Sequence, residues 1–307
     1  MSITLIATIV ALVLGHLAPS FAAAVRHFGW YRDLIGWCNN RFGEDSFWRG
    51  RWGIVLALLP AALVVGLLQS AFDDRLWGVA GLVFGTAVLF LAWGPRDLDR
   101  DVDAILDASD AATRRERVAQ MVDEAHTRGS GSGLVEAVFR NALRRWFGVL
   151  FWFLLVGPVG AVVYRLSVLA AVGPIAGEVP SHTREGARTW LALLEWPVAQ
   201  CMTLALALVG NFDSVLAAWR QANGASLTLD SRFLGAAARA SVNSELSEQG
   251  DVWVSDEDET ESGIAAPAVG MGLPDLPALR DAMSLVWRSL LAWLAVLALF
   301  LIAGFVG

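Results

Sequence analysis

The sequence predicts an all-α membrane protein: a polytopic bundle of about five or six transmembrane helices, with amphipathic helices in its cytoplasmic loops. Of its 307 residues 56% are hydrophobic and only 17% are charged, whereas soluble domains average about 25% charged. The apolar residues are gathered into blocks that approach the roughly 20 helical residues needed to cross a bilayer. Tryptophan marks the ends of these blocks, where its amphipathic ring prefers the headgroup level. These are Trp52, Trp77, Trp93, Trp146 and Trp190.

Hydrocarbon requires each segment to pair its own backbone polar groups, so the apolar blocks are expected to be helices. They are Ile54–Leu68, Trp77–Trp93, Phe147–Val172, Trp190–Val209 and Leu285–Val306, with Ile3–Leu17 as a marginal sixth. No basic residue precedes the marginal block, so we expect no signal cleavage there. A large soluble helical core with tryptophan at its rim is the alternative, which so many long apolar blocks disfavour.

Arginine distribution predicts the orientation of the chain. The segment Arg26–Arg51 holds five arginines and the loop Gly94–Arg145 holds nine, which places both in the cytoplasm by the positive-inside rule. The loop Gly173–Arg188 is then expected outside, and Asn211–Arg280 inside. Six crossings put both termini outside; if the first block lies flat on the inner surface, the N-terminus is cytoplasmic.

The domain organisation expected is one membrane domain over residues 1–307, interrupted by two cytoplasmic regions. The first, 95–146, has amphipathic periodicity at Val102–Leu106 and Val118–Ala125, a glycine–serine break, and a helix over Leu134–Trp146. The second, 211–283, contains a helix near Leu229–Leu246, capped by Asp230 or Thr228, and an acidic disordered linker at 250–277.

Composition excludes several kinds of chemistry. All 23 basic residues are arginine, which excludes a P-loop and a Schiff-base lysine. Cys38 and Cys201 are too far apart in the sequence to indicate a disulfide framework or a cysteine zinc site. The net charge of −7 gives no reason to expect nucleic acid, and no cofactor is expected.

Ionisable residues at membrane depth are the natural candidates for a site, because each costs roughly 2.5–3.5 kcal/mol to insert. A candidate polar pocket is formed by His16, Tyr164, Arg165, Glu195, Gln200 and Asn211. The alternative is structural: Glu195 would pair with Arg165 as a tie, and His16 would sit at the interface. That alternative is the more frequent fate of such residues.

Two charged clusters flank the apolar blocks. The weak metal candidates are Asp97, Asp99, Asp101 and Asp103, since carboxylates can hold Mg²⁺; a helix start rich in aspartate explains them better. Arg140, Arg144 and Arg145 precede the fourth block. They anchor its cytoplasmic end, and they are also candidates for binding an anionic lipid headgroup or phosphate.

One stretch carries a family resemblance. Phe151-Trp-Phe-Leu-Leu-Val-Gly-Pro-Val-Gly-Ala-Val-Val-Tyr-Arg165 resembles the signature shared by the AmpE proteins and the CobD/CbiB proteins of cobalamin synthesis. Leu194-Glu-Trp-Pro197, followed by Ala207-Leu-Val-Gly-Asn-Phe212, resembles AmpE in particular, although Gln200 stands where AmpE has arginine. The resemblance covers Leu134–Trp219 closely and most of the chain loosely.

The two branches imply different functions. CobD/CbiB proteins are amide-forming enzymes that attach an aminopropanol arm to a corrinoid, using ATP. Their early pattern contains aspartate, whereas Leu14-Gly-His-Leu-Ala-Pro19 has none, and Arg140 and Arg144 stand where those enzymes carry acidic residues. Both departures favour AmpE, a branch of inner-membrane proteins associated with β-lactamase induction and encoded beside a peptidoglycan-recycling amidase.

We therefore expect a non-enzymatic accessory or signalling protein of the bacterial inner membrane. Its expected partners are membrane lipids, the amidase or another envelope-signalling protein, and further copies of itself, since Gly157, Gly160 and Ala161 permit close helix packing. The alternatives are a CobD-like enzyme acting on a corrinoid or another anionic substrate, and a purely structural or lipid-binding protein.

Overall fold

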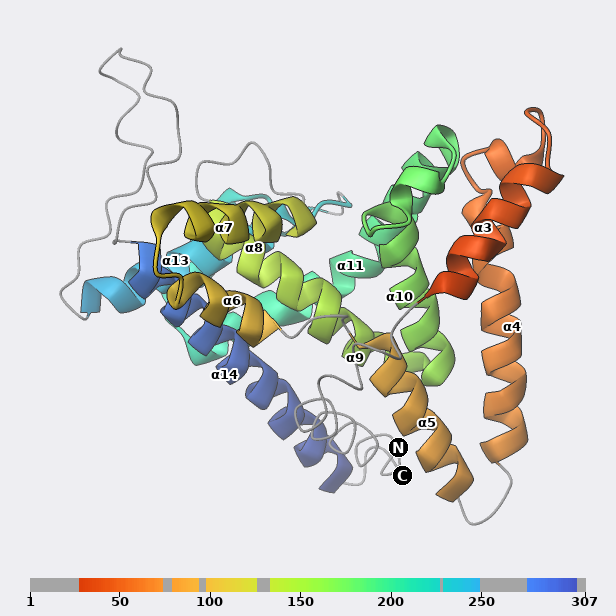
Figure 1. Ribbon diagram of the computed structural model, residues 1–307. Helices are drawn as coiled ribbons and strands as arrows, with labels where there is room; N and C mark the ends of the chain where they lie inside the picture. The colour runs from red at the N-terminus through yellow and green to blue at the C-terminus, as the bar shows by residue number, and fades with distance from the viewer. Residues whose placement is uncertain are drawn as a thin grey trace. The chain divides into compact units, whose positions relative to one another are not determined.

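The computed structural model describes residues 28–73, 79–93, 98–125, 133–226, 229–248 and 275–302 of the chain (Figure 1). Every regular element in these ranges is helical. The chain divides into two compact units. Unit 1 lies within Met1–Arg96, Arg144–Val198 and Leu294–Gly307, and unit 2 within Asp97–Leu143 and Ala199–Trp293.

Helix α4, Ile54–Asp73, is an apolar helix of unit 1 with most of its surface outward. Leu59, Leu63 and Leu67 recur every four residues along one face and are 50%, 56% and 70% exposed. Only 22% of its most apolar window is buried, whereas the core helix of a soluble protein would be mostly buried. A stripe of this size avoids water by facing lipid.

Two described helices are long and apolar enough to cross a bilayer: α4 over Ile54–Phe72, and α11, Ser181–Val209. Each contains a proline, Pro60 and Pro197 respectively, which membrane helices tolerate because neighbouring groups satisfy the freed carbonyl. The shorter apolar helices are α5, Val79–Ala92, and α10, Pro158–Ala171. The protein is thus an all-α membrane protein, as predicted.

The expectation of one continuous crossing over Phe147–Val172 is wrong. The segment forms two helices, α9 over Gly148–Val156 and α10, which meet at Gly157. Gly157 has φ +80°, a left-handed conformation open to glycine, and Pro158 starts the next helix. The aromatic ring of Tyr164 lies against Gly148, whereas one straight helix would separate these residues by about 24 Å. The chain therefore turns back at Gly157 as a helical hairpin.

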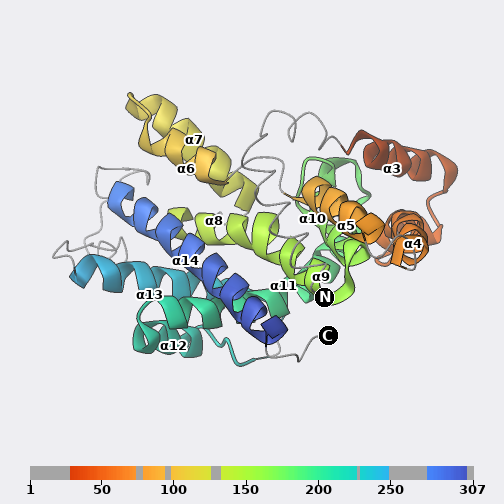
Figure 2. The ribbon, with the colours of Figure 1, turned by 90° about the horizontal axis from the view of Figure 1, so that it is seen from below.

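This hairpin packs on the other apolar helices of unit 1. Helix α10 contacts α4 and α5, and α9 contacts α5; both ribbon views place α4, α5 and α10 side by side (Figures 1 and 2). Phe153 and Pro158 lie beside Gly85 of α5, and within the hairpin the Trp152 carbonyl lies against Gly160, where a side chain would not fit. Small residues let the helices approach closely, as expected in lipid.

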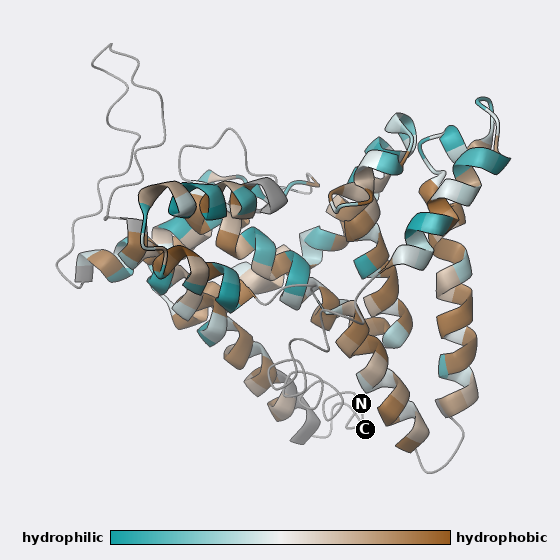
Figure 3. Ribbon diagram, viewed as in Figure 1, coloured by the Kyte–Doolittle hydropathy of each residue, from teal (hydrophilic) through white to brown (hydrophobic). Residues whose placement is uncertain are grey.

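The polar end of unit 1 joins segments that the sequence had suggested lie on opposite sides of the membrane. It comprises α3 (Gly29–Arg41), the 3₁₀ turns η1 (Phe47–Arg49) and η4 (Ala176–Glu178), and the start of α11. In Figure 3 these segments are paler or teal beside the brown α4 and α5.

Three contacts fix this arrangement. Arg32 Nε lies 2.8 Å from Glu178 Oε1, Asn39 Nδ2 donates to the Glu178 carbonyl at 2.9 Å, and the Thr183 hydroxyl donates to the Trp48 carbonyl at 2.6 Å. Segments that touch cannot be separated by a bilayer. The predicted external position of Gly173–Arg188 opposite Arg26–Arg51 is therefore wrong, and the hairpin is the reason.

Unit 2 is built from amphipathic helices. They are α6 (Leu98–Leu106), α7 (Ala111–Ala125), α8 (Gly133–Ala142), α12 (Phe212–Gln221), α13 (Arg232–Glu248) and most of α14 (Asp275–Ile302). Helix α8 packs against α7 and α13, and α13 packs against α12. Val102, Ile105, Val118 and Met121 are buried, so the helices predicted from their spacing are confirmed.

Several sequence expectations lie outside the described residues. These are the block Ile3–Leu17, the glycine–serine run, Thr228, and the greater part of the expected linker at 250–277. Helix α14 begins at Asp275, within the range assigned to that linker. Asp230 is described, and its Oδ1 accepts the backbone N–H of Arg232 at 3.0 Å, which supports the predicted start of α13.

Candidate functional site

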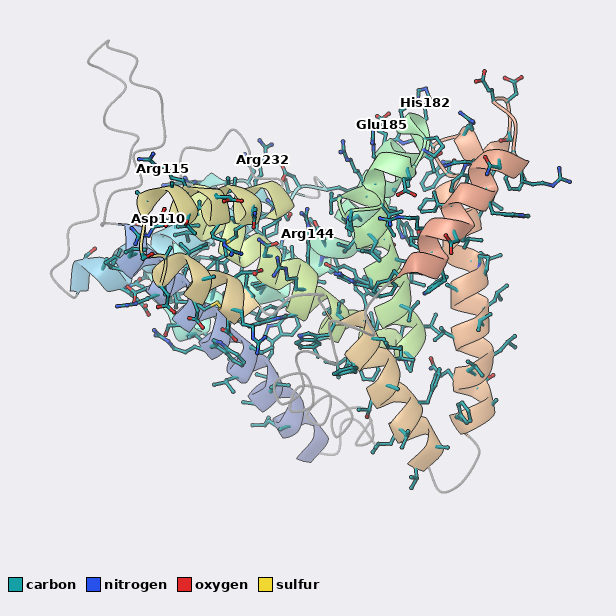
Figure 4. The ribbon with its side chains drawn as sticks, in the orientation of Figure 1. Asp110, Arg115, Arg144, His182, Glu185 and Arg232 are labelled. Carbon is teal, nitrogen blue, oxygen red and sulfur yellow. The ribbon has the colours of Figure 1, made fainter. Side chains whose placement is uncertain are left out.

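Unit 1 buries a group of charged side chains at the open end of the hairpin. Arg144, Arg145, Arg165 and Glu195 are each between 3% and 8% exposed. Arg144 and Arg145 lie on η3, a π-helical turn over Leu143–Phe147 that links α8 to α9; Figure 4 labels Arg144 at this place. Such turns occur often at functional sites. Burying charge is costly unless it is paired, so the contacts of this group decide its role.

Glu195 on α11 pairs with Arg144. Arg144 Nε donates to Glu195 Oε1 at 2.7 Å, with side chains 10% and 5% exposed. The structural alternative drawn from the sequence expected Arg165 as the partner, and that pairing is wrong. The hairpin brings η3, rather than the middle of α10, to the Glu195 carboxylate.

Tyr164 and Arg165 lie on α10 beside this pair of helices. Tyr164 is fully buried, with its ring against Gly148, where a Cβ would lie 2.1 Å from the Tyr164 Cζ. The Arg165 guanidinium carbon lies 6.0 Å from the centroid of the Phe28 ring, within cation–π range. Trp152 Nε1 donates to the Leu194 carbonyl at 3.2 Å and so ties α9 to α11 next to Glu195.

Unit 1 buries more basic than acidic side chains among its described residues. Among the described residues of unit 1, three buried guanidinium groups stand against one buried carboxylate, Glu195. Guanidinium groups bind carboxylate and phosphate oxygens in a bidentate manner, and a low-dielectric surrounding strengthens that attraction. Buried guanidinium groups of this kind are therefore candidates for holding an anionic group.

The other predicted pocket residues are used elsewhere or lie outside the description. In unit 2, the Gln200 side chain accepts from Trp219 Nε1 at 3.0 Å and donates to the Gly224 carbonyl at 2.7 Å. Asn211 caps α12 by accepting the backbone N–H of Ser214 at 3.0 Å. His16 lies outside the described residues. The structure thus places Tyr164 against α9, pairs Glu195 with Arg144 on the preceding turn η3, and sets Arg165 against Phe28. Gln200 and Asn211 make local structural contacts.

The remaining charged candidates behave differently from one another. Arg140 in unit 2 donates to the Ser231 hydroxyl at 2.6 Å. Asp99 accepts from Trp287 Nε1 at 2.7 Å, while Asp101 and Asp103 lie on the same helix, α6, and Asp97 is outside the described residues. Within the described ranges, no three histidine, cysteine or acidic side chains are grouped so as to hold a metal ion.

Sequence reasoning missed two features of the site. Gln69 of α4 lies against Gly157 at the tip of the hairpin, and its Oε1 accepts the backbone N–H of Val159 at 3.4 Å. Gly148 admits the Tyr164 ring. A polar residue late in an apolar block, and a Gly-Pro pair inside another, were the available signals.

These features define a class of protein: a helical membrane protein with a buried arginine-rich site at a helix hairpin. A model of the CobD/CbiB protein family matches residues 4–172, which is more than half of the chain. The chain belongs to this family. The match ends at Val172, the C-cap of α10, so it includes the hairpin and all the site residues except Glu195.

Two curated relatives agree with this assignment. The chain is 29% identical over 191 residues to a protein of Chromobacterium violaceum named cobalamin biosynthesis protein CobD, covering 58% of this chain and 59% of the relative. It is 30% identical over 173 residues to the protein of the same name from Stutzerimonas stutzeri, covering 54% and 55%. The chain therefore matches little more than half the length of these relatives, and no solved structure matches it. Nothing in these similarities distinguishes the AmpE branch.

Proposed function

We propose that this protein acts in cobalamin biosynthesis, as a membrane protein of the CobD/CbiB type that modifies a corrinoid or a comparable large anionic substrate. The observation that carries the proposal is the similarity to two proteins named for that pathway. It takes precedence over the β-lactamase signalling role expected from the sequence, because both relatives are named for cobalamin biosynthesis.

The buried arginines give this proposal a site. In ATP-driven amide formation of the kind this family is known for, the substrate carboxylate loses one oxygen as its C–O bond breaks, and that oxygen leaves in the phosphate released from ATP. The amine forms the new C–N bond and loses a proton to solvent. Arg145 and Arg165 would bind and orient the substrate carboxylate.

A complementation experiment tests the proposal. A bacterial strain lacking its own CobD/CbiB protein would receive the wild-type gene, Arg165→Ala, or Arg115→Ala as a matched control, since Arg115 is an exposed arginine of unit 2. We expect wild type and Arg115→Ala to restore cobalamin-dependent growth and the amidated corrinoid in cell extracts, and Arg165→Ala to lose at least tenfold of that product. A correctly inserted wild-type protein that restores neither would reject the proposal.

A second candidate function rests on the two arginines at positions where the amide-forming enzymes carry acids. Arg140 and Arg144 both serve structural contacts, with Ser231 and with Glu195, which suits a member of the family without catalysis. Such a protein would be an AmpE-type accessory of the inner membrane. Its sign would be loss of β-lactamase induction on deletion of the gene, together with failure of the corrinoid complementation.

A further inference from the structure

We propose that α9 and α10 form a re-entrant hairpin: the chain enters the bilayer near Arg144, turns back at Gly157, and leaves at Val172 on the side from which it entered. A ligand then reaches the buried arginine site at the open end of the hairpin from that side alone. This inference concerns the membrane topology of unit 1 and does not depend on the reaction proposed above.

The lengths of the two helices are the first argument. Beyond the arginine-bearing turn η3, helix α9 has 9 residues, and α10 has 14, which correspond to about 14 Å and about 21 Å of helix. The hydrocarbon core is about 30 Å thick. Neither helix crosses it alone, and the contact between Gly148 and Tyr164 excludes an end-to-end arrangement.

The position of the tip along α4 is the second argument. Gly157 lies against Gln69, and Gly66 lies 3.6 Å, measured from an added Cβ, from the Val159 side chain. Gln69 is 15 residues beyond Ile54, or about 22 Å along the helix axis. The hairpin therefore reaches roughly three-quarters of the way along a 20-residue crossing helix before it turns back.

The tip also solves the problem that a turn creates in hydrocarbon. A break in a helix frees backbone N–H groups, each costly to leave unpaired in lipid. Gln69 Oε1 accepts the Val159 N–H, and the Gly157 carbonyl accepts the Gly160 N–H at 3.0 Å. Irregular backbone at membrane depth is tolerated where protein groups satisfy it in this way.

The contacts at the polar end are the third argument, and they are independent of the tip. The ion pair between Arg32 and Glu178 and the bond from Thr183 to Trp48 join the segment after α10 to the segment before α4. Both segments are therefore on one side of the membrane. Arg184 and Arg188 then join the arginine-rich side, as the positive-inside rule favours. By the same reasoning α11 does not cross, because α13, which follows it, contacts α8, which precedes the hairpin.

Single-cysteine labelling tests the topology. In a background with Cys38→Ala and Cys201→Ala, the reporters would be Gly43→Cys, before α4, and Gly177→Cys, after α10, because a Cβ at either position meets nothing within 4 Å. Asp73→Cys, at the last residue of α4, marks the opposite side. A membrane-impermeant maleimide would be applied to spheroplasts and to inverted vesicles, after size-exclusion profiles confirm folding.

We expect Gly43→Cys and Gly177→Cys to label in the same preparation, and Asp73→Cys in the other. Labelling of Gly177→Cys together with Asp73→Cys, or protection of Gly177→Cys in both preparations, would overturn the proposal. A second measurement is a short bis-maleimide cross-link between Arg32→Cys and Glu178→Cys, expected to form within one chain. Its absence in folded protein would contradict the shared side, whatever the outcome of the corrinoid assay.

Discussion

The ion pairs that arginine forms differ in burial between the two units of this molecule. In unit 1, Arg144 and Glu195 are buried together at 2.7 Å. In unit 2, Arg288 lies 2.8 Å from Glu245, with side chains 44% and 16% exposed, and Arg239 lies 3.5 Å from Glu136. The same pair of residue types is thus buried in one unit and partly exposed to water in the other. Burial, rather than distance, therefore sets how strongly the stability of each unit depends on its ion pairs.

The largest effect is expected when the buried pair loses one partner. Glu195→Ala would leave the Arg144 guanidinium buried without its carboxylate and destabilise the protein by about 3–5 kcal/mol. Thermal unfolding of the purified protein in detergent measures this. The exchange Arg144→Glu with Glu195→Arg should recover part of the loss, because the charges again match. An unfolding temperature unchanged by Glu195→Ala would refute the dependence of unit 1 on this pair.

The next effect comes from the close contact inside the hairpin. Gly148→Ala would place a Cβ 2.1 Å from the Tyr164 Cζ, and the ring of a fully buried tyrosine has little room to move. Overpacking of this kind costs about 1–3 kcal/mol. Combining it with Tyr164→Leu should restore stability above that of Gly148→Ala alone in a double-mutant cycle. Additive losses would mean that α9 and α10 are not packed as a hairpin.

This hairpin is also where the structure differs from the prediction made from the sequence. The amphipathic helices α6 and α7 of unit 2 could be predicted, because local spacing alone identifies their buried faces. The residues concerned are Val102, Ile105, Val118 and Met121. Hydropathy over Phe147–Val172 could not separate one crossing from two short helices, since the same apolar residues suit both. Gly157 with Pro158 carried the signal for a break.

The partner of Glu195 was equally beyond the sequence. Arg144 and Arg165 are both basic residues at similar depth, and the choice between them depends on how α9 folds back along α10. Tyr164 and Arg165 could be predicted as buried polar residues, because ionisable groups in apolar blocks are rare. Their relation to Gly148 and Phe28 required the tertiary structure.

A smaller effect is expected at the partly exposed pair of Arg288 and Glu245 in unit 2. Glu245→Ala is the matched counterpart of Glu195→Ala, and it should cost about 0.2–1 kcal/mol, because water screens the Arg288 guanidinium, which is 44% exposed. The difference from wild type should shrink further at about 1 M salt, where the screening length is about 3 Å. Unfolding midpoints at low and high salt measure this. A loss as large as that of Glu195→Ala, or one insensitive to salt, would break the comparison between the units.

The smallest effect concerns the start of α7 in unit 2. Asp110 Oδ1 accepts the backbone N–H of Thr113 at 2.7 Å and its Oδ2 accepts the Thr113 hydroxyl at 2.7 Å. These bonds favour the ionised form and hold the pKa of Asp110 below its ordinary value of 3.8. The cap should therefore stabilise α7 fully above that value and lose its contribution as the pH falls through the lowered pKa.

Asp110→Asn would keep the capping hydrogen bond and remove the charge, because asparagine caps helices about as well as aspartate but does not ionise in this range. Hydrogen exchange of the peptide covering α7, compared between wild type and Asp110→Asn at each pH, cancels the intrinsic pH dependence of exchange. Protection in wild type should fall relative to the variant only in acid. A constant difference would show that charge contributes nothing to this cap, which would agree with the small effect expected when the exposed pair of Arg288 and Glu245 is broken.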